Sequence, residues 1–209
     1  MKNLVFQVDI PGKEGNGLLL RNTSLYEHSK IKAKEYADKV NADYFVLTEK
    51  IFKNYGPEVQ KFHLLHSKFD DYNHILYVDS DLVVYSNMPD LFDLASSIEE
   101  EFMATEEFKL ERVSLFPDYF NSGFMLFKKH LRVRLRDEWE YYYFRRKYYK
   151  VKLGEQHCFN LLINKFCNGY YKLSRDFNSL GNSTGKYNRH FTGTTKNNFD
   201  KKWISDMNI

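Results

Sequence analysis

Residues 75–81 read ILYVDSD, a short apolar run that leads directly into two carboxylates. An unbroken run of this length is typical of a strand that is buried on both faces of a sheet. Because side chains alternate along an extended chain, Asp79 and Asp81 are predicted to point the same way and Ser80 the opposite way. Ligands bind at this end of the strands in open α/β sheets. The pair predicts a cation site that grips a substrate diphosphate. The alternative is that one aspartate caps the next turn and the other is solvated.

The chain before this strand alternates between strand and helix patterns. Residues 4–10 and 43–48 are predicted strands. Residues 24–40 are a predicted helix that opens with an S-x-x-E capping box, and Pro57 begins a second helical pattern that continues to residue 69. The order strand, helix, strand, helix, strand predicts an α/β fold with parallel strands. The glycine-rich loop at 11–17 does not match a dinucleotide-binding fingerprint.

The chain after Asp81 changes character. Residues 82–85 read as a short extended piece, 87–92 as a helical turn, and 102–105 and 119–127 as further strands. Gly123 lies inside the last of these strands, where a glycine often marks a close approach of the backbone to a ligand. A long helix is predicted over residues 130–149.

The composition fits a single domain without a nucleic-acid partner. Of the 209 residues 43% are hydrophobic and 17% aromatic, which is ample for a core. The net charge of +3 is too small to indicate nucleic acid. Residues 128–152 combine Lys and Arg with aromatic side chains, which could indicate a nucleic-acid or membrane surface. We interpret this segment as an amphipathic scaffold helix.

The sequence predicts a cytoplasmic location. No run approaches the ~18 apolar residues that a membrane span requires. Residues 1–6 lead directly into a strand pattern and not into a signal peptide. Cys158 and Cys167 fit a reducing compartment and match no metal motif. The chain ends soon after Trp203, so further domains of a longer protein are expected partners.

Two later segments carry polar groups of the kinds that bind metals and phosphates. Glu155 and Gln156 fall in the first turn of a helix that begins at Gly154, where they can face a pocket. The alternative for Glu155 is a simple interaction with the helix dipole. His190 is followed by a small-residue loop and then by Lys196, a grouping that can supply a metal ligand and a phosphate contact. A lone histidine is more often structural.

Four segments, taken in order, resemble one family, the glycogenin-type family 8 glycosyltransferases and their relatives with the GT-A fold. YVDSD at 77–81 resembles the family's YLDAD segment, and FNSGFML at 120–126 resembles its FNSGVML strand. Residues 155–156 stand where the family carries an acidic residue followed by glutamine. HFTG at 190–193, with a lysine and a tryptophan further on, resembles the family's HFxG…K…W ending. The resemblance covers nearly the whole chain.

The resemblance implies one GT-A domain over residues 1–209, of the α/β class, with a central, mainly parallel mixed sheet flanked by helices. Its nucleotide-binding part would span residues 1–105 and its acceptor-side part residues 106–209. The small size, without a stem or a membrane anchor, is also similar to the glycosyltransferase domain of a chlorovirus, a large DNA virus. For a viral chain the expected compartment is the host cytoplasm.

The implied activity is metal-dependent transfer of a hexosyl or deoxyhexosyl group from a nucleotide-diphosphate sugar to a glycan or protein-linked acceptor. The expected donor is a UDP-sugar, and the expected ion is Mn²⁺ or Mg²⁺, which suit carboxylate, imidazole and phosphate ligands. Asp79, Asp81 and His190 would hold the ion. Lys196 would help to neutralise the diphosphate as the glycosidic bond breaks.

The resemblance also implies a set of site residues. The catalytic residues would be Asp79, Asp81, Lys196 and Glu155. The donor-binding residues would be Val8, Asp9, Lys61, Ser80, Asn121, Ser122, Gln156 and Gly193. Lys61 matches a family lysine that contacts the sugar or orients Asp79. Val8, Asp9 and the loop after them would hold the base and ribose. The polar residues of strand 120–126 and of the helix at 154 would bind sugar hydroxyls.

The chain departs from the family pattern on the acceptor side. It has KNN at 196–198 where the family often has KPW, and LSRDFN at 173–178 matches LPxxWN only loosely. The family retains the anomeric configuration. A relative that inverts it would need a carboxylate base near the acceptor, for which Asp118, Glu155 and Asp176 are candidates.

Two other functions compete with this interpretation. A phosphatase of the haloacid-dehalogenase type would use Asp79 as nucleophile and Asp81 as general acid. That class carries the motif on its first strand, whereas here two strand–helix units precede it. A non-catalytic sugar- or nucleic-acid-binding module would use the basic aromatic helix. Hydrolysis of a sugar donor in the presence of Mn²⁺ would separate the three.

Overall fold

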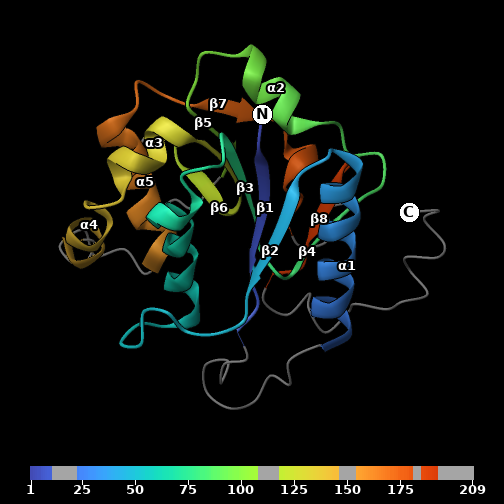
Figure 1. Ribbon diagram of the computed structural model, residues 1–209, viewed down its shortest axis with the longest axis horizontal. Helices are drawn as coiled ribbons and strands as arrows, with labels where there is room; N and C mark the ends of the chain where they lie inside the picture. The colour runs from blue at the N-terminus through green and yellow to red at the C-terminus, as the bar shows by residue number, and fades with distance from the viewer. Residues whose placement is uncertain (11–22, 108–117, 146–153, 181–184, 193–209) are drawn as a thin grey trace.

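The computed structural model describes residues 1–10, 23–107, 118–145, 154–180 and 185–192 (Figure 1). Its centre is a six-stranded mixed sheet with the strand order β2-β1-β3-β6-β5-β7. The strands are β1 Asn3–Val8, β2 Asp43–Leu47, β3 His74–Val78, β5 Phe102–Glu106, β6 Phe120–Lys128 and β7 Tyr171–Leu173. β1 is parallel to β2 and β3, and β7 is parallel to β5, whereas β6 is antiparallel to both of its neighbours. The predicted α/β class with a mainly parallel mixed sheet is confirmed.

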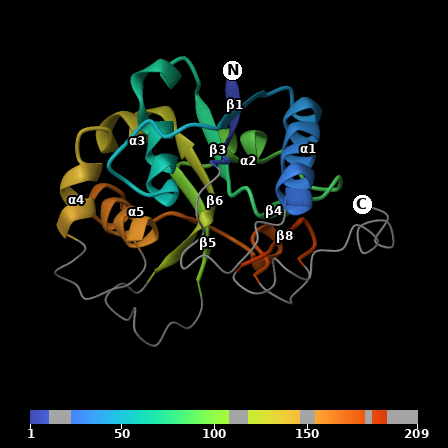
Figure 2. The same ribbon diagram turned by 90° about the horizontal axis from the view of Figure 1, so that it is seen from below.

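Helices cover both faces of this sheet (Figures 1 and 2). One face carries α1 Thr23–Lys39 and α2 Leu91–Ser97. The other face carries the 3₁₀ helix η1 Pro57–Leu65, α3 Lys129–Leu135, α4 Trp139–Arg145 and α5 Gly154–Phe166. Two short 3₁₀ turns complete the described helices, η2 Ser67–Phe69 and η4 Arg175–Phe177. The sheet is therefore the middle of three layers in a single domain.

Alternate side chains of β3 enter the two cores on either side of the sheet. Ile75 and Tyr77 pack with η1 and α5, whereas Leu76 and Val78 pack with α1 and α2. All five residues of β3 are buried. The apolar run before Asp79 therefore reflects burial on both faces, as the sequence predicts.

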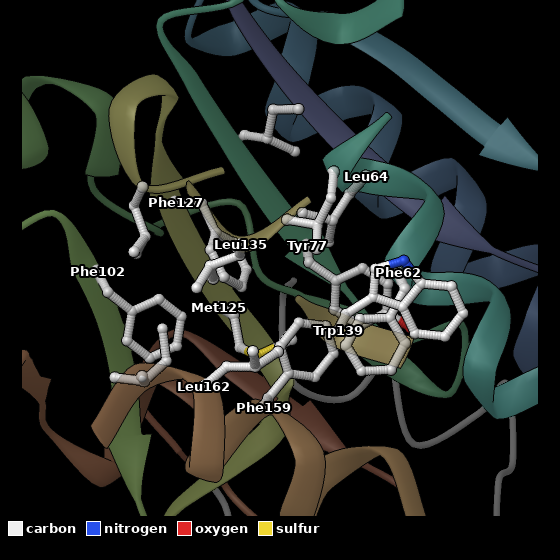
Figure 3. Close-up of a cluster of buried hydrophobic side chains, with 14 of the residues drawn as sticks. Phe62, Leu64, Tyr77, Phe102, Met125, Phe127, Leu135, Trp139, Phe159 and Leu162 are labelled. Atoms are coloured by element: carbon white, nitrogen blue, oxygen red, sulfur yellow. The ribbon is translucent and has the colours of Figure 1, made fainter. Parts of the chain in front are cut away.

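A stack of aromatic rings fixes η1 against the helices of its layer (Figure 3). The ring centroid of Phe62 lies 4.8 Å from that of Trp139 and 4.2 Å from that of Phe159, with nearly parallel planes in both pairs. Stacked aromatic pairs contribute about 0.5–1.5 kcal/mol each beyond the area that they bury. Because Lys61 precedes Phe62 on η1, the stack also holds the backbone of this lysine in place.

A second, two-stranded sheet brings the end of the described chain to the end of β3. β4 Leu82–Val84 follows Asp81 directly and pairs antiparallel with β8 Asn188–His190, so that Leu82 lies opposite His190. The backbone N–H of Phe191 donates to the carbonyl of Asp81 at 2.9 Å. This pairing places His190 beside the two aspartates.

The long helix predicted over residues 130–149 is wrong in its continuity. The described part of this segment forms α3 and α4, with a turn at residues 136–138 between them. The buried apolar residues of this segment recur at every fourth position and are Leu131, Leu135, Trp139 and Tyr143. Four-residue steps drift by about 40° per step around an ideal helix. All four side chains join the same core, and the turn between α3 and α4 changes the direction of the chain without interrupting this pattern.

Two further predictions need adjustment. The helical pattern that begins at Pro57 is a 3₁₀ helix and not an α-helix, and every residue from Val59 to Leu65 in it is buried. The helical turn expected at residues 87–92 is present only in its last two residues: residues 88–90 are not helical, and α2 begins at Leu91, with Asp90 as the N-cap that accepts from the backbone N–H groups of Phe92 and Asp93. Among the described helices, none is long and apolar enough to cross a membrane.

Candidate active site

Asp79, Asp81 and His190 come together at the edge of the sheet where β1 and β3 end. Each side chain offers one ligand atom, and these atoms lie within 4.8 Å of one another. His190 Nε2 lies 3.0 Å from Asp81 Oδ1 and 3.6 Å from Asp79 Oδ2. Two carboxylate oxygens and one imidazole nitrogen are donors that suit Mn²⁺ or Mg²⁺ with diphosphate oxygens in the remaining positions. The residues present therefore fit the implied metal ion.

A turn, and not strand alternation, makes the two aspartates converge. β3 ends at Val78, and the backbone N–H of Leu82 donates to the carbonyl of Asp79 at 3.0 Å, which closes a turn over residues 79–82. Ser80 lies half-buried in this turn between the two aspartates. The predicted convergence is confirmed, but the physical reason given for it was wrong.

Buried polar residues hold this turn from the α1 side. Gln7 Nε2 donates to the carbonyl of Asp79 at 3.4 Å and to Ser29 Oγ at 3.1 Å. The Ser29 hydroxyl in turn donates to the carbonyl of Leu82 at 2.6 Å. Both ends of the turn are thereby bonded to β1 and α1.

Lys61 forms the centre of a buried charge network on the other side of the turn. Its Nζ lies 3.0 Å from Glu155 Oε1 and 3.4 Å from Asp79 Oδ1. It is also within 3.4 Å of the hydroxyl of Ser122, which itself donates to Glu155 Oε1 at 3.2 Å. Tyr77 donates a further hydrogen bond to Asp79 Oδ1. The network joins η1, β3, β6 and α5 at one point.

The charges in this network stabilise one another. Burial opposes the charge on Lys61, but Asp79 and Glu155 outweigh it and raise the pKa of Lys61 above its usual value. Burial also opposes the charge on Glu155, and the lysine outweighs it, so that the pKa of Glu155 is lowered. Burial lowers the pKa of His190, whereas Asp81 and Asp79 raise it, and the net direction is upward. Glu155 is thus an ionised partner of Lys61.

Asn121 and Gln156 lie next to this network, and Asn121 also lines a cavity. Ser122 N–H donates to Gln156 Oε1 at 3.2 Å, and Gln156 Nε2 donates to Glu107. Asn121 Nδ2 donates to the same glutamate carboxylate at 3.4 Å. The cavity has a volume of about 220 Å³. Its lining residues are Thr105, Glu106, Glu107, Asn121, Arg175, Asn178, Ser179 and Leu180.

The remaining predicted residues lie at the end of β1 or outside the described residues. Val8 and Asp9 are buried where β1 ends, and Asp9 Oδ2 lies 3.1 Å from Lys30 Nζ of α1. They share the sheet edge with Asp79 because β1 and β3 are parallel neighbours. Gly193 and Lys196 lie outside the described residues, so their roles stay predictions.

The other two carboxylates considered as bases for an inverting reaction, Asp118 and Asp176, make contacts outside the lysine network. Asp118 is half-exposed and pairs with Lys172 of β7 at 2.5 Å. Asp176 accepts a hydrogen bond from the backbone N–H of Lys186 at 3.1 Å. Lys172 belongs to the outermost strand of the sheet, so Asp118 is at the sheet edge farthest from β1 and β2.

Several site residues were missed from the sequence. Tyr77, Glu107 and Asn178 all contact predicted site residues. Gly123 stays a predicted place of approach to a ligand, and a Cβ there would meet His190 and Asp79, two of the residues that would hold the metal ion. Among the three missed residues, only Asn178 had a local signal in the sequence, as the last residue of the segment that loosely resembles LPxxWN.

The comparison with known families agrees with this geometry. The sequence model of glycosyl transferase family 8 matches residues 23–200 of the chain.

The chain belongs to glycosyl transferase family 8.

Solved glycosyltransferases share the GT-A fold of this family 8 chain. A glycosyltransferase involved in the glycosylation of the major capsid of PBCV-1 is 14% identical and superposes with a TM-score of 0.64, over 99% of this chain and 100% of that chain. The galactosyltransferase LgtC, in complex with donor and acceptor sugar analogues, is 13% identical with a TM-score of 0.54, over 97% and 99% of the two chains. Mouse xyloside xylosyltransferase 1 is 12% identical with a TM-score of 0.58, over 93% and 99%. A search of curated protein sequences gave no match.

The family assignment decides between the competing functions. A family 8 chain is a glycosyltransferase, so the phosphatase and the non-catalytic module are excluded. The motif order agrees, because Asp79 follows the third strand of the chain and not the first. The fold similarity to the glycosyltransferase involved in glycosylation of the PBCV-1 capsid agrees with the narrower resemblance to a chlorovirus domain.

Proposed function

We propose that the protein transfers a hexosyl or deoxyhexosyl group from a UDP-sugar to a glycan or protein-linked acceptor with the help of Mn²⁺ or Mg²⁺. One observation carries the proposal. Asp79, Asp81 and His190 offer three hard or borderline ligand atoms at the ligand-binding edge of the sheet. The cavity beside Asn121 and Glu107 is a polar space for an acceptor sugar. The two free cysteines support a cytoplasmic reaction.

The lysine network has a defined task in this proposal. Lys61 and Glu155 are held within 3.0 Å of each other, and Lys61 also reaches Asp79. A buried lysine in this place holds the Asp79 carboxylate in its orientation before the substrate arrives. Asn121, Ser122 and the Glu155–Gln156 pair present amide, hydroxyl and carboxylate groups of the kinds that bind sugar hydroxyls.

The departing nucleoside diphosphate carries negative charge that the site has to neutralise. A bound divalent cation supplies positive charge that neutralises the diphosphate when the glycosidic bond breaks. Lys196 adds a second positive charge to the same diphosphate, as a compact point charge suited to phosphate. Val8 and Asp9 hold the base and ribose at the end of β1, with Ser80 and Gly193 as further donor contacts.

A donor-turnover assay tests the proposal. The protein is incubated with individual UDP- and GDP-sugars in Mn²⁺ or in EDTA, and the released nucleoside diphosphate is measured by chromatography. We expect release from a UDP-sugar in Mn²⁺ and none in EDTA. Asp81→Asn should abolish the release and leave the melting temperature nearly unchanged, because the residue lies in a turn at the edge of the sheet.

The matched control is Asp38→Asn on the exposed face of α1, where the aspartate pairs only with Lys34 among the described ion pairs. This variant should turn over the donor like the parent. Equal turnover in Mn²⁺ and EDTA would refute the metal dependence of the reaction. Turnover restricted to a GDP-sugar would show that the donor nucleotide is GDP and not UDP.

A further inference from the structure

Asn178 lies directly behind the imidazole of His190. Its Oδ1 is 3.0 Å from His190 Nδ1, and both side chains are at least nine-tenths buried. This is the ring nitrogen opposite the one that faces Asp79 and Asp81. The contact spans twelve positions in sequence, and nothing in the motif pattern predicts it.

The hydrogen-bond chain fixes the orientation of each amide in turn. The backbone N–H of Gly123 can only donate, so the Asn121 atom 2.8 Å away from it must be the oxygen. Asn178 then has to present its NH₂ group to Asn121 Oδ1, at 2.8 Å. Its oxygen is left to face His190, and an amide oxygen only accepts. His190 Nδ1 must therefore carry the hydrogen.

A second contact supports the same assignment. Asn121 Nδ2 donates to Glu107 Oε2 at 3.4 Å, and the same oxygen accepts from Gln156 Nε2. The contacts of Asn121 with Gly123 and with Glu107 therefore both require the same orientation of its amide group. With the hydrogen on Nδ1, Nε2 is the ring nitrogen that faces the two aspartates and the one that can give its lone pair to a metal ion.

We propose that Asn178 is a positioning residue that fixes the tautomer and the ring orientation of His190 for metal binding. The proposal rests on the proposed metal site. Asn178 touches no ligand atom of that site and acts through His190. Its backbone is held independently of its side chain, because its N–H donates to Arg175 O at 3.2 Å and the next residue pairs with β8. Replacement of the side chain should therefore leave the fold intact.

Mn²⁺ affinity, measured from the loss of the free-ion signal in electron paramagnetic resonance, tests the proposal without substrate. Asn178→Leu should weaken the Mn²⁺ affinity by about 10- to 100-fold, the usual cost of losing the partner of a ligating histidine. Asn73→Leu is the matched control, since it makes the same substitution at an exposed asparagine that precedes β3, at the end of the strand opposite Asp79, and it should bind Mn²⁺ like the parent. Melting curves in EDTA show whether each variant is folded.

A double-mutant cycle separates this role from general destabilisation. In the His190→Ala background, Asn178→Leu should cause no further loss of Mn²⁺ affinity, because the residue it acts through is gone. In the Mg²⁺-saturated parent, the proton on His190 Nδ1 should give a slowly exchanging signal in a long-range ¹H–¹⁵N spectrum. Asn178→Leu should abolish that signal.

Three results would overturn the proposal. Parent-like Mn²⁺ affinity in Asn178→Leu would remove the positioning role while the metal site stands. Losses that add in the double variant would assign Asn178 an effect independent of His190. A parent chain that binds no Mn²⁺ would overturn the metal site itself and the role of Asn178 with it.

Discussion

Glycine at position 123 leaves the space that the His190 ring occupies. A Cβ atom there would lie 2.4 Å from His190 Cε1 and 2.8 Å from Asp79 Oδ2. Both neighbours are held by hydrogen bonds or ion pairs, so neither can move away at low cost. We expect Gly123→Ala to displace the ring and to weaken Mn²⁺ binding at least tenfold. The control is Gly154→Ala at the start of α5, where a Cβ would meet no atom within 4 Å. Equal Mn²⁺ affinity in the two variants would contradict the account.

Lys61 is the buried cation that compensates the charges of two partly buried carboxylates. Its side chain is 5% exposed and pairs with Glu155 and Asp79. Removal of one partner of a buried ion pair typically costs about 3–5 kcal/mol, because the other charge is left uncompensated. Lys61→Met should lower the free energy of unfolding by this amount in urea titrations performed in EDTA. The double variant with Glu155→Gln should recover part of the loss, since it removes the orphaned charge. If Lys61→Met is as stable as the parent, the ion pairs of Lys61 do not contribute this free energy of unfolding.

Lys196 is predicted from the sequence to act on the leaving diphosphate. If it stabilises charge that develops as the bond breaks, Lys196→Ala should lower kcat about 100-fold or more and change KM for the donor little. Lys196→Arg should recover part of kcat because the charge remains. Lys201→Ala and Lys202→Ala are the controls in steady-state kinetics. A kcat for Lys196→Ala that equals those of the controls would end this assignment.

The 3₁₀ helix η1 carries a second buried ionisable group, His63, which packs against aromatic rings. The ring centroids of Phe52 and Phe69 lie 6.2 Å and 5.6 Å from that of His63. Burial, together with Lys68 and His66, lowers the pKa of His63 to about 4. The unfolded chain, with the ordinary histidine pKa of about 6.5, binds a proton first as the pH falls. The contribution of His63 to the free energy of unfolding should therefore be fully present above about pH 6.5. It should be lost progressively down to about pH 4, by up to about 3 kcal/mol.

His63→Phe should flatten this pH dependence. Thermal melting between pH 7 and pH 4 in EDTA measures it, with the exposed His130→Phe on α3 as control. An unchanged pH dependence in His63→Phe would show that another group is responsible.

The elements around β3 were predictable because each rests on a local pattern. Burial of β3 on both faces gives the continuous apolar run, and α5 gives apolar residues at helical spacing. The break between α3 and α4 was not predictable in this way, because the pattern of apolar residues continues through it. Arg136 in the turn donates to Leu65 O at 2.8 Å and pairs with Asp70, contacts with residues distant in sequence that no local pattern shows.

The site residues likewise fall into those that are close in sequence and those that are far apart. Asp79 and Asp81 are neighbours in sequence, so their convergence was predictable. Lys61 and Glu155 are 94 positions apart, and Asn121 and Asn178 are 57 apart. Only the topology of the sheet, with β6 antiparallel beside β3, brings these pairs together. The resemblance to a family supplied some of these residues, but the spacing alone could not supply their partners.

At the scale of the whole molecule, three strand ends and one returning strand build the site. β1 and β3 end at the same edge of the sheet because they are parallel, and antiparallel β6 begins there. β8 returns along β4 to add His190. The helical layers on both faces hold these ends in place (Figure 2). This edge is where we expect a nucleotide diphosphate to bind through a divalent cation.

Calorimetric titration of UDP into the protein, in Mn²⁺ and in EDTA, tests that claim most directly. The account predicts that UDP binds at least tenfold more tightly in Mn²⁺, and that Asp81→Asn loses this difference while Asp38→Asn keeps it. Equal affinity for UDP in Mn²⁺ and in EDTA would contradict the account.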